Sequence, residues 1–374
     1  TELRNNGTIS VDYDNSVGIH GKGASLIENN SIITGTGTGN TGIYEKKNTA
    51  FPAITTIINN SSVSLGDNGI GIYAENSNIT NNGSIVTGNS LGTGYSAGIY
   101  GKDSTIVNNG DVSIKNNGIA FIADNTTVDL NSGNIDDAGG SLVYAENGSV
   151  VNYKLGNRIT GKNPYIYLTD SVINFISPVK IEVSDNGTGI FSTGTLSGIN
   201  GNLSLDIGNN AFGIYLQNTG LYTNNSIINV NGAKAKGIAA ENADVANVGE
   251  ININNEGSAG IYSYLTSAGS VNIVNNTGMI NVNGENSKGI YGTGAGISGQ
   301  ITVNNSGEIN LGNSNDPDKT KAGIYGDEAV IINNTGDING GVDIIGIYSD
   351  GAIITQSGKI KLGDTSTGIF SSGG

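Results

Sequence analysis

The chain has 374 residues, of which 60 are glycine and 4 are proline, and it contains no cysteine. The scarcity of proline excludes a collagen-like chain, and the absence of cysteine excludes disulfides, thiolate zinc sites and a thiol nucleophile. The formal net charge is −15 and the basic residues are scattered, so we predict no nucleic-acid binding, which needs a basic face.

A tripeptide of Gly, Ile and an aromatic residue recurs along the chain and sets its period. Copies begin at residues 18, 42, 71, 98, 118, 142, 165, 189, 213, 237, 260, 289, 323, 346 and 368. The copies at 142 and 165 are degenerate, and those at 118 and 237 carry Ala in the third place. The commonest spacing is 22 to 24 residues, which indicates a solenoid of repeated supersecondary units.

Two further apolar-alternating stretches follow the tripeptide in each repeat. One is a short x-Ile-x-Asn unit, as at 78–81, and the other follows an Asn-Asn-Gly turn, as at 108–114. Alternation with a period of two between Asn, Gly and Ser is typical of strands, and helical spacing is not sustained anywhere. We therefore predict an all-β fold, a single-stranded parallel β-helix of about 15 coils with roughly 22–24 residues per coil.

Equivalent residues of successive coils stack in such a fold. Ile72, Ile79 and Ile85 are predicted to point inward, and corner Asn residues are predicted to form a hydrogen-bonded amide ladder. If the Ile of the tripeptide points inward, the aromatic residue after it points outward. The aromatic residues then form an exposed stripe with gaps at Ala120 and Ala239.

The outward Tyr residues are candidates for binding a partner, because Tyr combines an apolar ring with a polar tip. The candidates are Tyr44, Tyr73, Tyr100, Tyr262, Tyr291, Tyr325 and Tyr348. The alternative interpretation is a stacking ladder that only stiffens the fold.

Extra residues interrupt the period at two corners. They lie before the tripeptide at 35–41, 88–97 and 312–322, and after it at 46–56, 264–270 and 293–300. Insertions in a solenoid become surface loops, which often carry binding. Further candidate partner-binding residues in these loops are Tyr95, Asp316, Asp318 and Lys319. The alternative is that these insertions are neutral and bind nothing.

Residues 158–183 depart from the repeat and contain Pro164 and Pro178. We predict that residues 1–374 form one continuous domain in which this stretch is irregular. A kink, or a boundary between two segments, is the alternative.

Residues suited to catalysis are sparse. His20 is the single histidine, and no nucleophile motif accompanies it. Hydrolysis of polysaccharides needs paired carboxylates, for which Asp136-Asp137 and the loop residues Asp316 and Asp318 are the best candidates. Neither a calcium-roll repeat nor a phosphate-binding loop is present. We predict a non-catalytic chain with no metal site and no cofactor.

The repeat unit Gly-Ile-Tyr-Ala-Glu-Asn at 71–76, followed by Asn-Asn-Gly-Ser-Ile at 81–85, resembles the passenger region of type V (monomeric) autotransporters. It looks closest to the very large fusobacterial adhesins of the RadD kind, and the resemblance covers essentially the whole chain. It implies a right-handed β-helix and a monomer at the bacterial cell surface. It also implies a C-terminal outer-membrane β-barrel in the same parent chain, and a virulence role through attachment to host cells or other bacteria. The implied partner is a protein or glycan receptor. The resemblance transfers no binding residue, because the matching motif is the structural repeat itself.

We therefore expect a segment of a longer secreted protein that acts as a non-catalytic adhesive stalk. The alternatives are a polysaccharide-degrading β-helix enzyme and a pure structural spacer with no ligand. Filamentous two-partner-secreted adhesins and phage tailspikes are rival families with similar helices.

Overall fold

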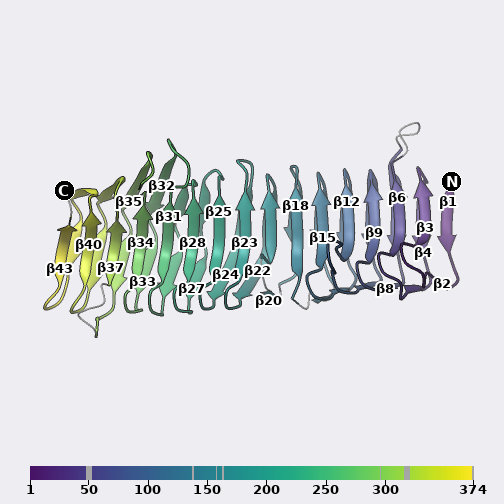
Figure 1. The fold of residues 1–374 in the computed structure, drawn as a ribbon, viewed down its shortest axis with the longest axis horizontal. Coiled ribbons are helices and arrows are strands. Elements are labelled where there is room, and N and C mark those ends of the chain that lie inside the picture. Colours follow the sequence, from purple (N-terminus) through teal and green to yellow (C-terminus); the bar gives the residue numbers. More distant parts are fainter. Residues whose placement is uncertain are drawn as a thin grey trace. The chain divides into compact units, whose positions relative to one another are not determined.

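A computed structural model describes residues 1–47, 53–136, 139–156, 158–161, 164–294, 296–315 and 321–372. The described residues form 43 strands and no helix, which confirms the predicted all-β class (Figure 1). No described segment is a helix of the length and apolarity needed to cross a membrane.

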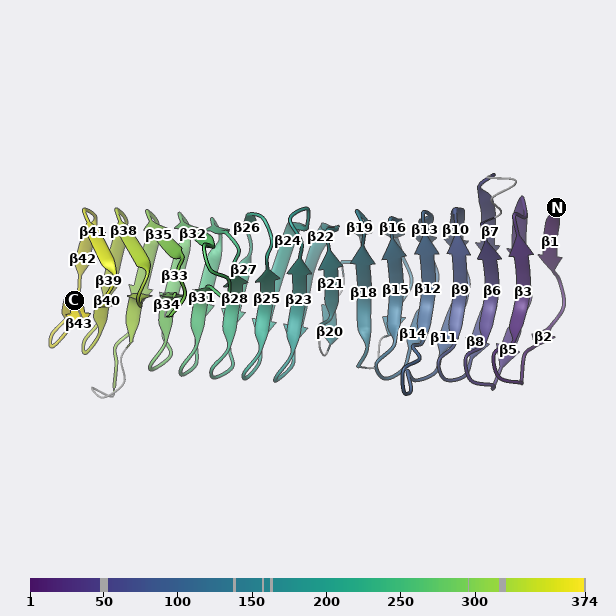
Figure 2. The ribbon, with the colours of Figure 1, turned by 45° about the horizontal axis from the view of Figure 1, so that its top comes forward.

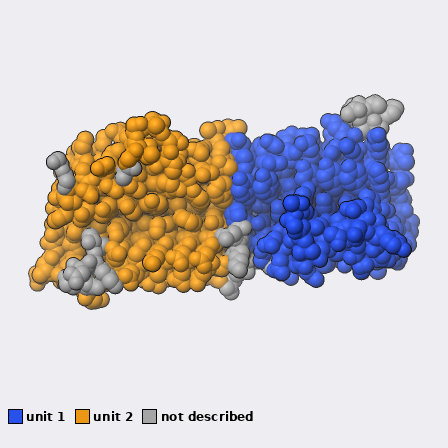
Figure 3. Space-filling view, in the orientation of Figure 1, with its two compact units in different colours: residues 1–156, 161–177 blue, residues 157–160, 178–374 orange. Residues whose placement is uncertain are grey.

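The chain divides into two compact units, coloured separately in Figure 3. Unit 1 comprises residues 1–156 and 161–177, and unit 2 comprises residues 157–160 and 178–374. The division falls within the stretch 158–183 that interrupts the sequence repeat. One continuous domain stays a prediction.

In each unit, every regular turn contributes three strands, and each strand pairs in parallel with its equivalent in the next turn (Figures 1 and 2). We call the three resulting faces first, second and third in chain order, the first holding the Gly-Ile-aromatic strands. The first face has seven strands in unit 1 and eight in unit 2, so the predicted parallel solenoid of about 15 turns is confirmed. Its handedness stays a prediction.

The strands of unit 1 are as follows. The first face comprises β3 (Val17–Lys22), β6 (Thr41–Lys46), β9 (Ile70–Glu75), β12 (Ala97–Lys102), β15 (Ile119–Asp124), β18 (Ser141–Glu146) and β21 (Ile166–Thr169). The second face comprises β1 (Glu2–Asn5), β4 (Leu26–Asn29), β7 (Thr55–Asn59), β10 (Ser77–Asn81), β13 (Thr105–Asn108), β16 (Thr127–Leu130), β19 (Val150–Tyr153) and the start of β22 (Val172–Val183). The third face comprises β2 (Ile9–Ser10), β5 (Ile33–Gly35), β8 (Ser62–Leu65), β11 (Ser84–Thr87), β14 (Val112–Ile114) and β17 (Ile135–Asp136).

The strands of unit 2 repeat the same order. The first face comprises β23 (Thr188–Thr193), β25 (Phe212–Gln217), β28 (Lys236–Glu241), β31 (Ala259–Tyr264), β34 (Lys288–Thr293), β37 (Ala322–Gly326), β40 (Ile345–Asp350) and β43 (Thr367–Ser372). The second face comprises β26 (Tyr222–Asn224), β29 (Val245–Asn247), β32 (Val271–Asn276), β35 (Gln300–Asn305), β38 (Val330–Asn334) and β41 (Ile353–Gln356). The third face comprises β24 (Gly198–Ile207), β27 (Ile227–Val230), β30 (Glu250–Ile253), β33 (Met279–Val282), β36 (Glu308–Leu311), β39 (Asp337–Gly340) and β42 (Lys359–Lys361), while β20 (Arg158–Gly161) lies off these faces and pairs with β22.

Branched apolar side chains fill the interior of each turn. Ile72, Ile79 and Ile85, one from each face of one turn, are at most 1% exposed, which confirms their predicted inward orientation. The ladder register places Ile72 between Ile43 and Ile99 in the neighbouring turns. Burying one such side chain contributes about 1.5–3 kcal/mol, so the stacked interior is the main stabilising element of the fold.

The Gly of the tripeptide is required by a close approach to the third face. Gly71 and Ile72 are both buried, so the alternation of the strand is broken at this point. A Cβ on Gly71 would lie 2.6 Å from the carbonyl oxygen of Gly98 and would overlap the side chain of Ile85. At this turn, the missing Cβ of glycine lets the first face pack against Ile85 of the third face.

Buried Asn side chains form the predicted amide ladder at the end of the second face. In unit 1, the Nδ2 atoms of Asn5, Asn29, Asn59 and Asn81 each donate, at 2.8 Å, to the Oδ1 atom of the Asn in the next turn, ending at Asn108. In unit 2, the same ladder runs through Asn224, Asn247, Asn276, Asn305 and Asn334 to Gln356, with distances of 2.6 to 2.8 Å.

The unit 1 ladder ends where bulky residues take the Asn position. Leu130 pairs with Asn108, and Tyr153 pairs with Leu130. Phe175 follows in register, with its ring centroid 5.8 Å from that of Tyr153. Bulky side chains thus replace the amide ladder over the last turns of unit 1.

One predicted copy of the tripeptide is misplaced. The register pairs Ile99 with Phe121 and Tyr100 with Ile122, so the aromatic position of this turn is Ile122 rather than Ala120. The sequence prediction was wrong because it aligned on Gly118. The small residue that packs against the third face is instead Ala120, which is fully buried.

Candidate functional site

The tripeptide aromatics form a column of ring contacts, some stacked and some edge-to-face, on the outer side of the first face in each unit. In unit 1, ring centroids are 5.0 Å apart for His20–Tyr44 and Tyr44–Tyr73, and 4.8 Å apart for Tyr73–Tyr100 and Tyr144–Tyr167. In unit 2, the separations are 5.2 Å for Tyr262–Tyr291, 4.9 Å for Tyr291–Tyr325, 4.6 Å for Tyr325–Tyr348 and 5.1 Å for Tyr348–Phe370. These separations lie within the range of favourable aromatic pairs.

The column points outward as predicted, but its rings are half-buried rather than fully exposed, because each ring covers its neighbours. Burial raises the pKa of the Tyr325 hydroxyl to about 12 and also raises that of Tyr291. The Nζ atoms of Lys236 and Lys288 lie 5.9 and 5.8 Å from the ring centres of Tyr262 and Tyr325. The accessible surface is thus a strip of ring edges and neutral hydroxyls.

The predicted gap at Ala120 is wrong, because Ile122 occupies that position and is only 6% exposed. The gap at Ala239 exists, but Tyr264 covers it. The Tyr264 ring stacks 5.0 Å from Tyr262, and its hydroxyl lies 2.7 Å from that of Tyr215. The column therefore has a bridged gap rather than an open one.

A group of hydrogen-bond donors surrounds the single carboxylate of Glu241 at this bridge. This cluster was not predicted from the sequence. Glu241 accepts hydrogen bonds from Tyr264 at 2.9 Å, Gln217 at 3.0 Å and Thr266 at 2.8 Å, and also from Tyr215. Burial alone would raise the pKa of Glu241, but these hydrogen bonds lower it below its ordinary value. No Tyr-x-Glu spacing marks Glu241 in the sequence, because Ala239 stands two residues before it, whereas Tyr73 and Glu75 have that spacing and a 2.9 Å hydrogen bond.

Tyr95 is the one predicted loop residue that the structure describes. Tyr95 is 41% exposed in the loop between β11 and β12 of unit 1. Asp316, Asp318 and Lys319 lie outside the described residues, as does Asp137.

The end of the 312–322 loop is anchored by a buried lysine. Lys321 is fully buried, and its Nζ atom donates to the carbonyl oxygens of Asn283 at 2.9 Å and Asn313 at 2.6 Å. The same ammonium lies 3.6 Å from the carboxylate of Glu285. Burial lowers the pKa of Lys321, and Glu285 opposes that effect.

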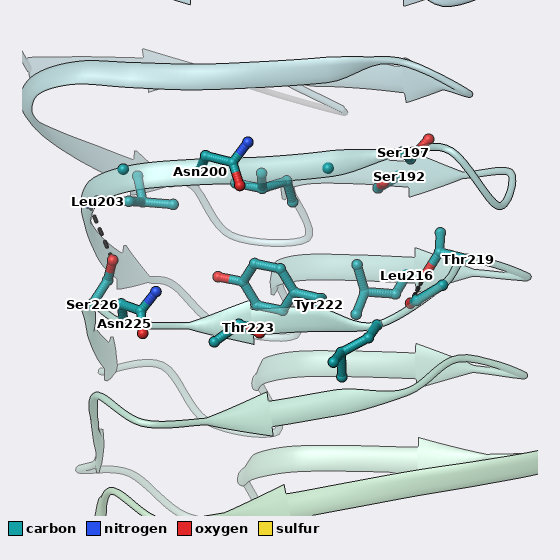
Figure 4. Close-up of a pocket in the computed structure, with 15 residues that line it drawn as sticks. Ser192, Ser197, Asn200, Leu203, Leu216, Thr219, Tyr222, Thr223, Asn225 and Ser226 are labelled. Carbon is teal, nitrogen blue, oxygen red and sulfur yellow. Dashed lines mark hydrogen bonds between the residues drawn. The ribbon is translucent and has the colours of Figure 1, made fainter.

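A cavity of about 340 Å³ opens in unit 2 between the β23–β24 segment and the strand β26 (Figure 4). We call it the Tyr222 pocket, because the ring of Tyr222 lies at its centre. Its wall is made of small, polar and aliphatic residues, with Leu203 and Leu216 on the inner side. None of the residues that line it is charged.

Over the described ranges, no group of three or more His, Asp or Glu side chains lies in an arrangement that could hold a metal ion. Comparison with known proteins adds no identity. No protein-family model matches the chain, no curated protein matches it, and no solved structure matches it.

Proposed function

We propose that the chain is a passenger segment of a bacterial surface adhesin of the type V autotransporter kind. In this proposal it is a monomeric stalk anchored in the outer membrane by the C-terminal barrel of its parent chain, and it attaches to a protein or glycan receptor on host cells or other bacteria. The sequence pattern of the repeat and the parallel solenoid fold support this assignment.

The observation that carries the proposal is the outward aromatic column. Tyr rings alternate with inward Ile along each first face, so successive turns present an ordered row of ring edges and hydroxyls. Tyr is enriched at protein interfaces because it contributes contact area at a low entropic cost. A row of such residues suits adhesion through many weak, repeated contacts.

The test is binding of the purified 374-residue chain to intact host cells and partner bacteria. The variant replaces Tyr262, Tyr291, Tyr325 and Tyr348 by Ile, because Ile122 already occupies this position in unit 1 and the column should stay packed. The matched control replaces four outward residues of the third face, Ile227, Glu250, Met279 and Glu308, by Thr. Saturable binding that falls in the Tyr variant and persists in the control is the expected result.

A pure spacer is the second candidate. It is favoured because the side chains of the ladders contact one another and need no ligand. The amide ladder and the ring stack satisfy their own contacts without a ligand. Equal binding by the two variants, or no binding by the unmodified chain, would favour the spacer and remove the adhesive site from this segment.

A further inference from the structure

The Tyr222 pocket arises from a local change in the turn. Most turns of unit 2 break into separate second-face and third-face strands, whereas β24 runs from Gly198 to Ile207 without that break. Among the described residues, β26 is consequently the edge strand of the second face and pairs only with β29. The pocket lies beside this free edge (Figure 4).

The free edge offers backbone hydrogen-bonding groups to the pocket. The N–H of Tyr222 donates to the carbonyl oxygen of Asp244 at 3.0 Å, and the carbonyl oxygen of Asn224 accepts from the N–H of Val248 at 2.9 Å. Both residues therefore direct these backbone groups toward the turn that contains β29. In a parallel ladder the intervening residue directs its N–H and C=O to the opposite side. Thr223, which lines the pocket, therefore directs its backbone groups toward the cavity.

Two hydroxyls in the pocket wall make no hydrogen bond to the described part of the protein. Tyr222 is 7% exposed and Ser192 is 2% exposed, and neither hydroxyl makes a hydrogen bond within the described part of the chain. Ser263 and Ser349 occupy the same strand position as Ser192 in other turns. Ser263 accepts from Asn272 at 3.0 Å, and Ser349 donates to the carbonyl of Ala352 at 3.1 Å. Neither oxygen is one of the fully enclosed, unpartnered polar atoms of the described residues, so both are open to the cavity and available to a ligand there.

The size and charge of the pocket restrict its occupant. Its volume of about 340 Å³ lies at the lower end of the range for small-molecule pockets, which leaves room for one sugar ring rather than a chain. Without a charged residue in its wall, the pocket would penalise an ionised ligand, which would lose its hydration without gaining a counter-charge.

We propose that the Tyr222 pocket binds one uncharged, hydroxyl-rich molecule of monosaccharide size, with the hydroxyls of Ser192 and Tyr222 and the free edge of β26 as hydrogen-bond partners. The aliphatic side chains of Leu203 and Leu216 pack against the C–H face of the ring. This site does not depend on the proposed adhesion, because it is separate from the aromatic column and takes a soluble ligand.

The competing explanation is a packing defect that holds only water. The test titrates the 374-residue chain with D-glucose, D-galactose, D-mannose and N-acetyl-D-glucosamine, using calorimetry or ligand-observed NMR. D-Glucosamine and D-glucuronate serve as charged counterparts. We expect at least one neutral sugar to bind, and its charged counterpart to bind at least tenfold more weakly.

Two variants locate the site. Tyr222→Phe removes one unpartnered oxygen, so it should leave the thermal midpoint unchanged or higher while weakening sugar binding about fivefold. Ser192→Leu should abolish binding by filling the pocket, and the solenoid accepts Leu here because Leu216 holds the equivalent position in the next turn. Tyr13→Phe, at a residue that is 86% exposed, is the matched control and should bind as the unmodified chain does.

Failure of every neutral sugar to bind would overturn the proposal in favour of the packing defect. Binding that survives Ser192→Leu would place the sugar elsewhere and also overturn it. Binding of glucuronate as tight as that of glucose would contradict recognition by an uncharged wall. None of these results bears on binding to cells, which the Tyr-column variant tests separately.

Discussion

The amide ladder allows a sharp test of how burial sets the strength of a hydrogen bond, because two adjacent Asn residues differ almost only in exposure. Asn81 is fully buried, accepts from Asn59 at 2.8 Å and donates to Asn108 at 2.8 Å. Its neighbour Asn82 is exposed, donates to Asn60 at 3.0 Å and accepts from Asn109 at 3.0 Å. Both residues therefore belong to ladders of the same form.

The predicted costs of replacing each residue by Ala differ by several kcal/mol. Asn81→Ala removes two buried hydrogen bonds, at about 1 kcal/mol each, and leaves the Asn59 donor and the Asn108 acceptor unsatisfied, at about 1 kcal/mol or more each. The sum is about 3–5 kcal/mol. Asn82→Ala removes two bonds that water replaces, so its cost should stay below about 0.5 kcal/mol.

The assay is urea-induced unfolding of the full chain, followed by far-ultraviolet circular dichroism, with the three proteins measured in parallel. The Asn81→Ala protein should unfold at a clearly lower urea concentration, whereas the Asn82→Ala protein should match the unmodified chain. Equal shifts for the two variants, or a loss below about 1 kcal/mol for Asn81→Ala, would show that the buried ladder adds little and would refute the reasoning.

Three further predictions concern single side chains. Gly71→Ala should lower the thermal midpoint strongly, because the new Cβ would approach the Gly98 carbonyl oxygen to 2.6 Å, whereas Gly7→Ala, with no atom within 4 Å of the new Cβ, should not. Burial raises the pKa of Glu45 above its ordinary value of 4.5, against hydrogen bonds from Gly23 and Thr55. The contribution of Glu45 to stability is therefore full below that ordinary value and is lost as the pH rises through the raised pKa. Glu45→Gln should remove this slope in a pH series of unfolding experiments and stabilise the chain at pH 8 by about 1–2 kcal/mol. Lys321→Met should cost about 2–3 kcal/mol and reduce hydrogen-exchange protection of the amides near Gly312, because the carbonyls of Asn283 and Asn313 lose their donor. Unchanged protection there would show that the lysine does not anchor the loop.

The regular part of this fold was predictable because its stabilising contacts repeat with the sequence. Ile72 and Asn81 recur at fixed offsets, and parallel stacking turns each recurrence into a contact with the next turn. The period alone therefore fixed the strand number per turn, the inward Ile residues and the buried ladder. The error at Gly118 shows the limit of that reasoning. A small residue marks the first face, and where Gly118 and Ala120 both qualify, only packing against the third face selects Ala120.

The candidate sites were less predictable, because they depend on departures from the repeat. The Glu241 cluster needs Tyr264 to cross the gap left by Ala239, which is a contact between turns that no single repeat encodes. The Tyr222 pocket exists because β24 continues as one strand through a corner where other turns have two separate strands. The local sequence pattern of residues 198–207 does not indicate this continuity. Both features occur where one turn fails to reproduce the next. In a solenoid the regular faces present the same contact in every turn, so a pocket for a single small ligand should be sought at such interruptions.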